Sequence, residues 1–136
     1  MFVAASTGCF PNLPLPEVIE ALSDLEFTCV EIVFDDNGTQ MPPARIVEEF
    51  DECLRLVRDK DRLDICSYTG KIAAEGDIYY ERFAKICDLA KATKVVTLTI
   101  PSGEHGTPFN QEVEHLQKLV GIASDRSVRI GLKSQI

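Results

Sequence analysis

Positive charge is scarce in this sequence of 136 residues. It has 14 Lys and Arg against 22 Asp and Glu, so the formal net charge is −8 and the pI is about 4.7. Proteins that bind the phosphate backbone of nucleic acids need clustered Lys and Arg to release counterions. The charge balance therefore argues against a nucleic-acid partner.

Long apolar runs are also missing. A membrane-spanning helix needs at least about 18 consecutive apolar residues, and no run in the sequence approaches this length. Residues 1–5 contain neither a basic segment nor a long apolar segment, so no secretory signal is expected. We expect no membrane partner and a cytoplasmic location.

The cysteines are not arranged as a disulfide framework or a zinc site. There are five, an odd number, with no Cys-x-x-Cys pair and no His nearby at zinc spacing. Reduced thiols are the simplest interpretation, and they agree with a cytoplasmic location.

Apolar segments of strand type alternate regularly with segments of helical periodicity. Such a pattern predicts a parallel sheet connected by right-handed crossovers, and the length is that of one domain, 1–136. Strands are expected at residues 2–7, 29–34, 63–68, 95–100 and 128–133, and helices at residues 16–26, 43–60, 77–92 and 111–124.

The two faces of the predicted strands differ in polarity. Because successive side chains of a strand point to opposite faces, one face is mostly aliphatic and the other is partly polar. Tyr68 falls on the partly polar face. Charged groups buried on this face would need partners, so Glu31, Asp64 and Arg129 are expected to form a network. The polar members of this face are Glu31, Asp35, Asp64, Thr97, Thr99, Arg129 and Lys133.

Two architectures have this strand spacing, an open doubly wound sheet and a (β/α)8 barrel. An open parallel sheet is buried on both faces and should be apolar on both, whereas a barrel can hold polar groups inside, near a site at the carboxyl ends of its strands. We therefore predict an α/β fold of the TIM-barrel type. It is incomplete, with about four βα units and a fifth strand, because a full barrel needs about 250 residues.

Residues 21–32, Ala-Leu-Ser-Asp-Leu-Glu-Phe-Thr-Cys-Val-Glu-Ile, carry a family resemblance. They resemble the A-x-x-x-L-G-F-x-x-V-E-L passage at the second strand of xylose isomerase-like barrels, the family of sugar phosphate isomerases and epimerases. The sequence departs from this passage at Glu26, where the family usually has Gly. The resemblance implies that the chain is the N-terminal half of such a barrel and is inactive alone.

The chemistry implied by the resemblance is metal-assisted proton transfer on a sugar or sugar phosphate. The cofactor would be a divalent metal such as Mn, Mg, Zn or Co. Only the first metal-ligand position of the family lies inside this chain, and it is Lys133 when residues 129–133 are aligned with the family's R-L-G-L-E. Because an ammonium group cannot ligate a cation, no metal ligand is expected within this chain.

The candidate site residues are substrate-binding residues, and the catalytic residues stay unknown. Lys133 would bind an anionic substrate group or pair with a carboxylate such as Glu31. His105, Glu104, Tyr68 and Asp35 are expected at the rim near the strands' carboxyl ends. Glu31 belongs to the partly polar face of the second strand. The full set is Lys133, His105, Glu104, Tyr68, Glu31 and Asp35.

Two other functions stay open. One is a metal-free carbohydrate-binding or structural protein on a decayed isomerase scaffold. The other is a receiver-like signalling module, which needs acidic residues where this chain has Thr7-Gly8 and Ser67-Tyr68. Because the two end strands of a half barrel lack neighbours, self-association is also expected.

Overall fold

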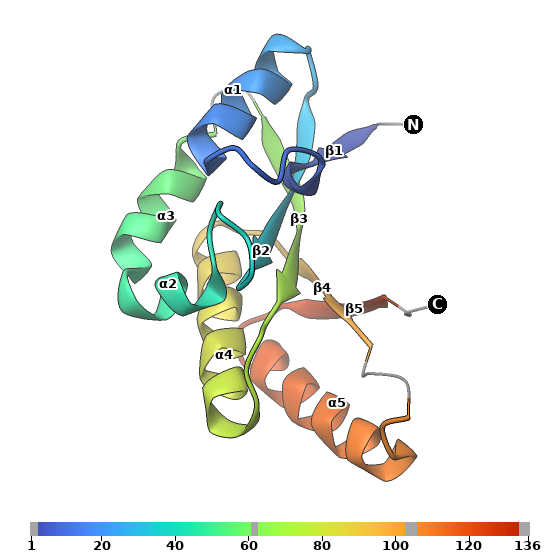
Figure 1. Ribbon diagram of the computed structural model, residues 1–136. Helices are drawn as coiled ribbons and strands as arrows, with labels where there is room; N and C mark the ends of the chain where they lie inside the picture. Colours follow the sequence, from blue (N-terminus) through green and yellow to red (C-terminus); the bar gives the residue numbers. More distant parts are fainter. Residues whose placement is uncertain (1–2, 61–62, 103–105, 134–136) are drawn as a thin grey trace.

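The computed structural model describes residues 3–60, 63–102 and 106–133 (Figure 1). The strands are β1 (Ala4–Ser6), β2 (Cys29–Asp35), β3 (Asp64–Lys71), β4 (Thr97–Pro101) and β5 (Arg129–Lys133). The helices are the 3₁₀ turn η1 (Thr7–Cys9), α1 (Leu15–Asp24), α2 (Pro43–Glu48), α3 (Phe50–Arg58), α4 (Gly76–Ala92) and α5 (Phe109–Ser124).

The five strands form one parallel sheet whose order follows the sequence, β1-β2-β3-β4-β5. In a doubly wound sheet the strand order reverses at a switch point, and no reversal occurs here. Figure 1 shows the helices gathered on one side of the strands, as in the wall of a barrel. The expected α/β fold built from TIM-barrel-like units is confirmed.

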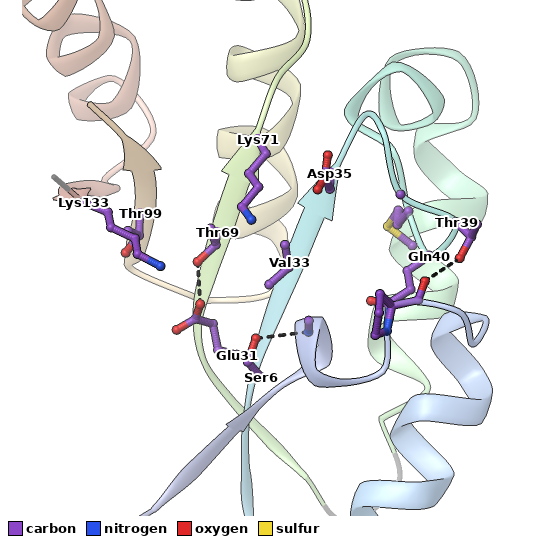
Figure 2. A pocket seen from close by; sticks show the side chains of 14 residues that line it. Ser6, Glu31, Val33, Asp35, Thr39, Gln40, Thr69, Lys71, Thr99 and Lys133 are labelled. Carbon is purple, nitrogen blue, oxygen red and sulfur yellow. Dashed lines mark hydrogen bonds between the residues drawn. The ribbon is translucent and has the colours of Figure 1, made fainter. Parts of the chain in front are cut away.

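An irregularity in the register of β2 and β3 decides which side chains share a face. Val30 pairs with Ile65, but the next residue, Glu31, pairs with Ser67, so Cys66 is an extra residue on β3. Such a β-bulge inverts the alternation beyond it. Ser67 and Thr69 therefore face the Glu31 side of the sheet. Figure 2 shows Thr69 and Lys71 on this side.

Tyr68 consequently lies in the core, and its predicted place on the polar face is wrong. Its side chain is wholly buried, with its ring centroid 4.9 Å from that of Phe34. Its hydroxyl is 2.7 Å from Oγ1 of Thr93 at the end of α4. Strict alternation from Asp64 had placed it on the other face, because alternation alone does not reveal a bulge.

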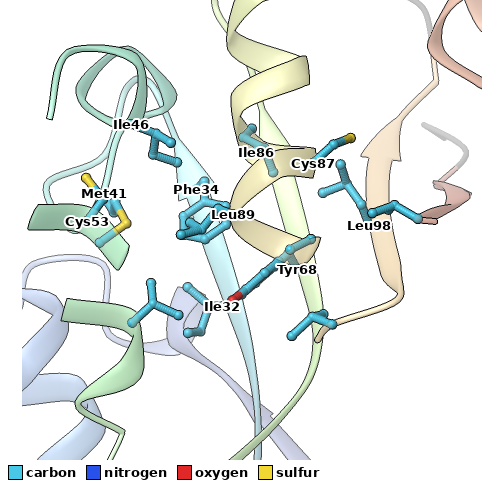
Figure 3. Close-up of a cluster of buried hydrophobic side chains, with 14 of the residues drawn as sticks. Ile32, Phe34, Met41, Ile46, Cys53, Tyr68, Ile86, Cys87, Leu89 and Leu98 are labelled. Carbon is cyan, nitrogen blue, oxygen red and sulfur yellow. The ribbon is translucent and has the colours of Figure 1, made fainter. Parts of the chain in front are cut away.

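The hydrophobic core fills the space between the helices and the sheet (Figure 3). Val30, Ile32 and Phe34 of β2 are completely buried and face the helices, in agreement with the predicted aliphatic face. The helices contribute side chains at helical spacing, including Ile46 of α2 and Ile86 of α4. This packing fixes the strands and leaves their opposite face free to form a site.

The predicted network of Glu31, Asp64 and Arg129 is not formed. Asp64 and Arg129 are exposed, each at the amino end of its strand, and therefore remain solvated. Glu31 instead accepts hydrogen bonds from hydroxyl groups of β3. Asp64 and Arg129 therefore need no partner, because they stay exposed to solvent and do not pay the free-energy cost of burying a charge.

The single helix predicted for residues 43–60 is divided into α2 and α3. Glu49 between them has φ −129° and ψ 50°, outside the helical region. The apolar residues on the two sides, Ile46 and Cys53, are both completely buried. No Gly or Pro marks this break, so the sequence pattern did not predict it.

Within the three described segments, no helix has the length and apolar character required to cross a membrane.

Candidate functional site

A cavity of about 420 Å³ lies on the face of the sheet opposite the helices (Figure 2). Its floor is made by strand residues, and the loops after β1 and β2 form a wall. The strand residues that line it are Ser6, Glu31, Val33, Asp35, Thr69, Lys71, Thr99 and Lys133, and the loop residues are Gly8, Pro11, Gly38, Thr39, Gln40 and Met41.

The carboxylate of Glu31 is held by two hydroxyl groups of the neighbouring strand. Thr69 Oγ1 donates to its Oε1 at 2.5 Å, and Ser67 Oγ donates to its Oε2 at 3.3 Å. Thr69 is almost completely buried, with 7% exposure. The carboxylate therefore has a fixed position at the bottom of the cavity, with further lone pairs free to accept hydrogen bonds.

Two lysines bring positive charge to the same cavity. Lys71 is the last residue of β3 and Lys133 is the last of β5. Figure 2 shows both side chains extending toward the space above Glu31. In the described parts of the chain, neither ammonium group forms an ion pair with a carboxylate. Both groups are exposed and can contact a ligand.

The wall of the cavity is built by hydrogen bonds between two loops. The side-chain amide of Gln40, in the loop after β2, donates to the backbone oxygens of Thr7 and Phe10, both at 2.8 Å. Thr7 is completely buried, and its Oγ1 accepts a 2.9 Å hydrogen bond from the backbone N–H of Val33. These contacts join the short β1 segment to β2 and position the loops over the strands.

The neighbouring acids Asp35 and Asp36 have different surroundings. Asp35 lines the cavity, whereas Asp36 accepts hydrogen bonds from the backbone N–H groups of Ala44 and Ala73. Asp36 also forms a 2.9 Å ion pair with Arg82 of α4, and its side chain is only 6% exposed. Asp36 is therefore a structural residue that holds the first turn of α2 and the loop after β3, and the pair does not act as a joint ligand.

The structure brings together three of the candidate residues derived from the sequence. Glu31, Asp35 and Lys133 line the cavity, whereas Tyr68 belongs to the core. Glu104 and His105 lie outside the described residues.

Sequence reasoning missed Lys71 and the role of Thr69. The predicted third strand ended at residue 68, three residues before the observed end of β3. Pairing with β2 could have revealed the extension, because Asp35 at the end of β2 lies opposite Lys71.

The described donors do not fit a divalent cation. Among the described residues there is no group of three or more His, Cys, Asp or Glu that could hold a metal ion. The cavity also contains two ammonium groups, which repel a cation. These residues therefore give no basis for a metal-dependent step.

The comparisons with solved structures establish the fold. An uncharacterized protein from Parabacteroides distasonis ATCC 8503 is 15% identical, with a TM-score of 0.68 over 98% of this chain and 53% of its own. A xylose isomerase domain protein from Planctomyces limnophilus is 14% identical, with a TM-score of 0.61 over 97% of this chain and 51% of its own. The chain thus spans about half the length of these structures. No family model matches the sequence, and no curated protein matches it significantly.

Proposed function

We propose that this chain supplies part of the substrate site of a barrel of the sugar isomerase or epimerase type, and that its cavity binds a sugar or sugar phosphate. The observation that carries the proposal is the carboxylate of Glu31, fixed by two hydroxyl groups at the base of a 420 Å³ cavity. The likeness to a xylose isomerase domain protein supports the same class.

The lining of the cavity suits a ligand with several hydroxyl groups. A sugar hydroxyl can donate a hydrogen bond to Glu31 and accept one from a neighbouring hydroxyl such as that of Thr99. Val33 provides an apolar surface for the carbon skeleton. A carboxylate in a fixed position is also suited to move a proton of a bound substrate.

We further propose that conversion of the substrate requires residues outside this chain. The chain spans about half of each structural neighbour, and the cavity offers only Glu31 and Asp35 as described carboxylates. Isomerisation and epimerisation move a proton off and back onto carbon, which in general requires groups placed on both sides of the substrate. The chain alone should therefore bind its ligand without converting it.

Calorimetric titration of the chain with a panel of sugars and sugar phosphates tests the proposal. Saturable binding is expected, and Glu31→Gln should weaken it about tenfold because a charge-assisted hydrogen bond is lost. Glu81→Gln, an exposed change on α4 outside the cavity, is the matched control. Absence of binding for every sugar and sugar phosphate would contradict the proposal.

A second candidate is a metal-free carbohydrate-binding or structural protein on a decayed isomerase scaffold. It is favoured by Lys133 and Lys71 in a cavity whose described residues do not fit a metal. Deuterium incorporation from heavy water into a carbon-bound position of the sugar, by a longer protein that contains this chain, separates the two. The receiver-like alternative is disfavoured because receivers have a doubly wound strand order.

A further inference from the structure

We propose that Lys71 and Lys133 together bind the anionic group of the ligand, so that the site selects a phosphorylated or carboxylated sugar over a neutral one. In this arrangement the two lysine ammonium groups supply the positive charge. The inference rests on the proposed function, because it assumes that the ligand of the cavity is a sugar.

The position of the two lysines follows from the sheet. They end β3 and β5, which are separated only by β4, so their backbones are roughly 10 Å apart. Both line the same cavity, and Figure 2 shows the two side chains extending toward the space above Glu31, one from β3 and one from β5. Two long, flexible side chains can converge across this span on one phosphate or carboxylate group.

The carboxylates of the cavity leave these lysines available. Both oxygens of Glu31 accept hydrogen bonds from Ser67 and Thr69, and Asp35 Oδ1 accepts one from the backbone N–H of its own turn. Neither acid forms an ion pair with Lys71 or Lys133 in the described segments. The donors of both lysine side chains are therefore available to a ligand.

Thr99 adds a hydroxyl group between the two lysines. It lies on β4 and lines the cavity, directly opposite Gly131 of β5. A Cβ atom at position 131 would come within 3.1 Å of Thr99 Oγ1. The glycine thus leaves the hydroxyl uncrowded on the β5 side, where it can donate a third hydrogen bond to the anionic group.

The two lysines lie in a protein whose net charge is negative. With a formal charge of −8, the chain as a whole repels anions. An anionic ligand therefore needs local positive charge, and the cavity provides it at two strand ends. A neutral sugar gains nothing from the same groups beyond ordinary hydrogen bonds.

The test is calorimetric titration with four probes: inorganic phosphate, a sugar phosphate, the corresponding neutral sugar and the corresponding sugar acid. Lys71→Met and Lys133→Met keep an unbranched side chain, one atom shorter, but remove the charge, and Lys91→Met on the exposed face of α4 is the matched control. Each cavity variant should weaken binding of the charged sugars about tenfold, the effect of one charge-assisted hydrogen bond. Affinity for the neutral sugar should fall by a much smaller factor, because it loses only an ordinary hydrogen bond, and Lys91→Met should bind like the wild type.

The outcomes separate this inference from the proposed function. If Glu31→Gln weakens sugar binding but both lysine variants bind charged sugars normally, the inference fails and the proposed function stands. If phosphate binds with lysine dependence and a sugar phosphate binds no better, the sugar-binding function fails while the anion site is supported. Saturable Mn²⁺ binding that Glu31→Gln abolishes would overturn the assignment of an anion site. Preference for the sugar phosphate or for the sugar acid identifies the natural anionic group.

Discussion

Thr69 and Glu31 connect β3 to β2 beneath the cavity through a 2.5 Å hydrogen bond from the threonine hydroxyl to Oε1. The bond exists because the bulge at Cys66 turns Thr69 toward the polar face of the sheet. The same bulge that turns Tyr68 into the core thus also turns Thr69 toward Glu31, and so positions the carboxylate of the candidate site.

Replacing Thr69 tests this relationship. Thr69→Val keeps the shape of the side chain but removes the donor, and should lower the free energy of unfolding by about 1 kcal/mol. It should also weaken sugar phosphate binding, because Glu31 loses a fixed orientation. Urea denaturation and calorimetry measure the two effects, and Thr69→Ser, which retains the hydroxyl, should largely preserve both. Equal behaviour of the Val and Ser variants would contradict the assigned role.

Gln40 should control the wall of the cavity. Gln40→Glu replaces the amide that donates to the oxygens of Thr7 and Phe10 with a carboxylate that repels them. We expect faster hydrogen exchange in residues 7–11 and several-fold weaker ligand binding. Gln117→Glu, an exposed change of the same kind on α5, should alter neither property. Unchanged exchange in Gln40→Glu would show that the loops are held by other contacts.

Glu26 follows α1 with a φ of 66°, in the left-handed region that disfavours side chains. Glu26→Gly should therefore raise the free energy of unfolding, by about 1 kcal/mol at most because glycine also increases the entropy of the unfolded chain. Glu26→Ala, which keeps Cβ, should bring no such gain. Thermal or urea unfolding of both variants decides the point, and a destabilised glycine variant would refute the prediction.

Stability should fall at alkaline pH. Burial raises the pKa of Tyr68 from 10.0 to about 12, that of Tyr79 from 10.0 to about 12 and that of Cys87 from 9.0 to about 12. Between about pH 9 and 12 the folded state therefore holds protons that the unfolded state has released. Because the folded state then binds more protons, stability present at lower pH is lost as the pH rises through this window.

The variant Tyr68→Phe provides the check for this pH dependence. It removes one titrating group, so the fall in unfolding free energy with pH should become less steep in urea denaturation series. The lost hydrogen bond to Thr93 lowers stability at every pH and does not alter the slope. An unchanged slope in the variant would show that Tyr68 does not contribute.

Self-association should increase with protein concentration. In the described structure β1 pairs only with β2 and β5 only with β4, so each end strand has a free edge. Val3 beside one edge is 66% exposed and Leu132 on the other is 52% exposed. Sedimentation velocity should detect larger species, and Leu132→Lys should reduce them because charge on an edge opposes strand pairing.

The matched control for this substitution is Leu25→Lys, which introduces the same charge at an exposed leucine away from the sheet. It should leave the association unchanged. A strictly monomeric wild-type chain at all concentrations would disprove the expectation.

The bulge in β3 shows where sequence reasoning reached its limit. Alternation predicted the faces of β2 correctly, because Val30, Ile32 and Phe34 are all buried. In β3 the same rule exchanged Ser67 and Tyr68, since one extra residue inverts every later side chain. The position of a bulge depends on pairing with the neighbouring strand, which a single strand's pattern does not contain.

In the candidate site, too, some residues could be predicted from the sequence and others depended on how the strands pair. Glu31, Asp35 and Lys133 were recognisable because each is a charged residue in or at the end of an apolar strand segment. The contribution of Lys71 depended on the true length of β3, and the partners of Glu31 depended on its register.

Apolar spacing along the chain was enough to predict the succession of strands and helices and the class of fold, because burial of one face imposes that spacing locally. Which polar residues meet depended on how the strands pair and pack. The paired strands bring Lys71 and Lys133 to one cavity and leave Asp64 and Arg129 in solvent. Strand register depends on contacts between residues that are far apart in the sequence. The periodicity of apolar residues shows only which side chains are buried.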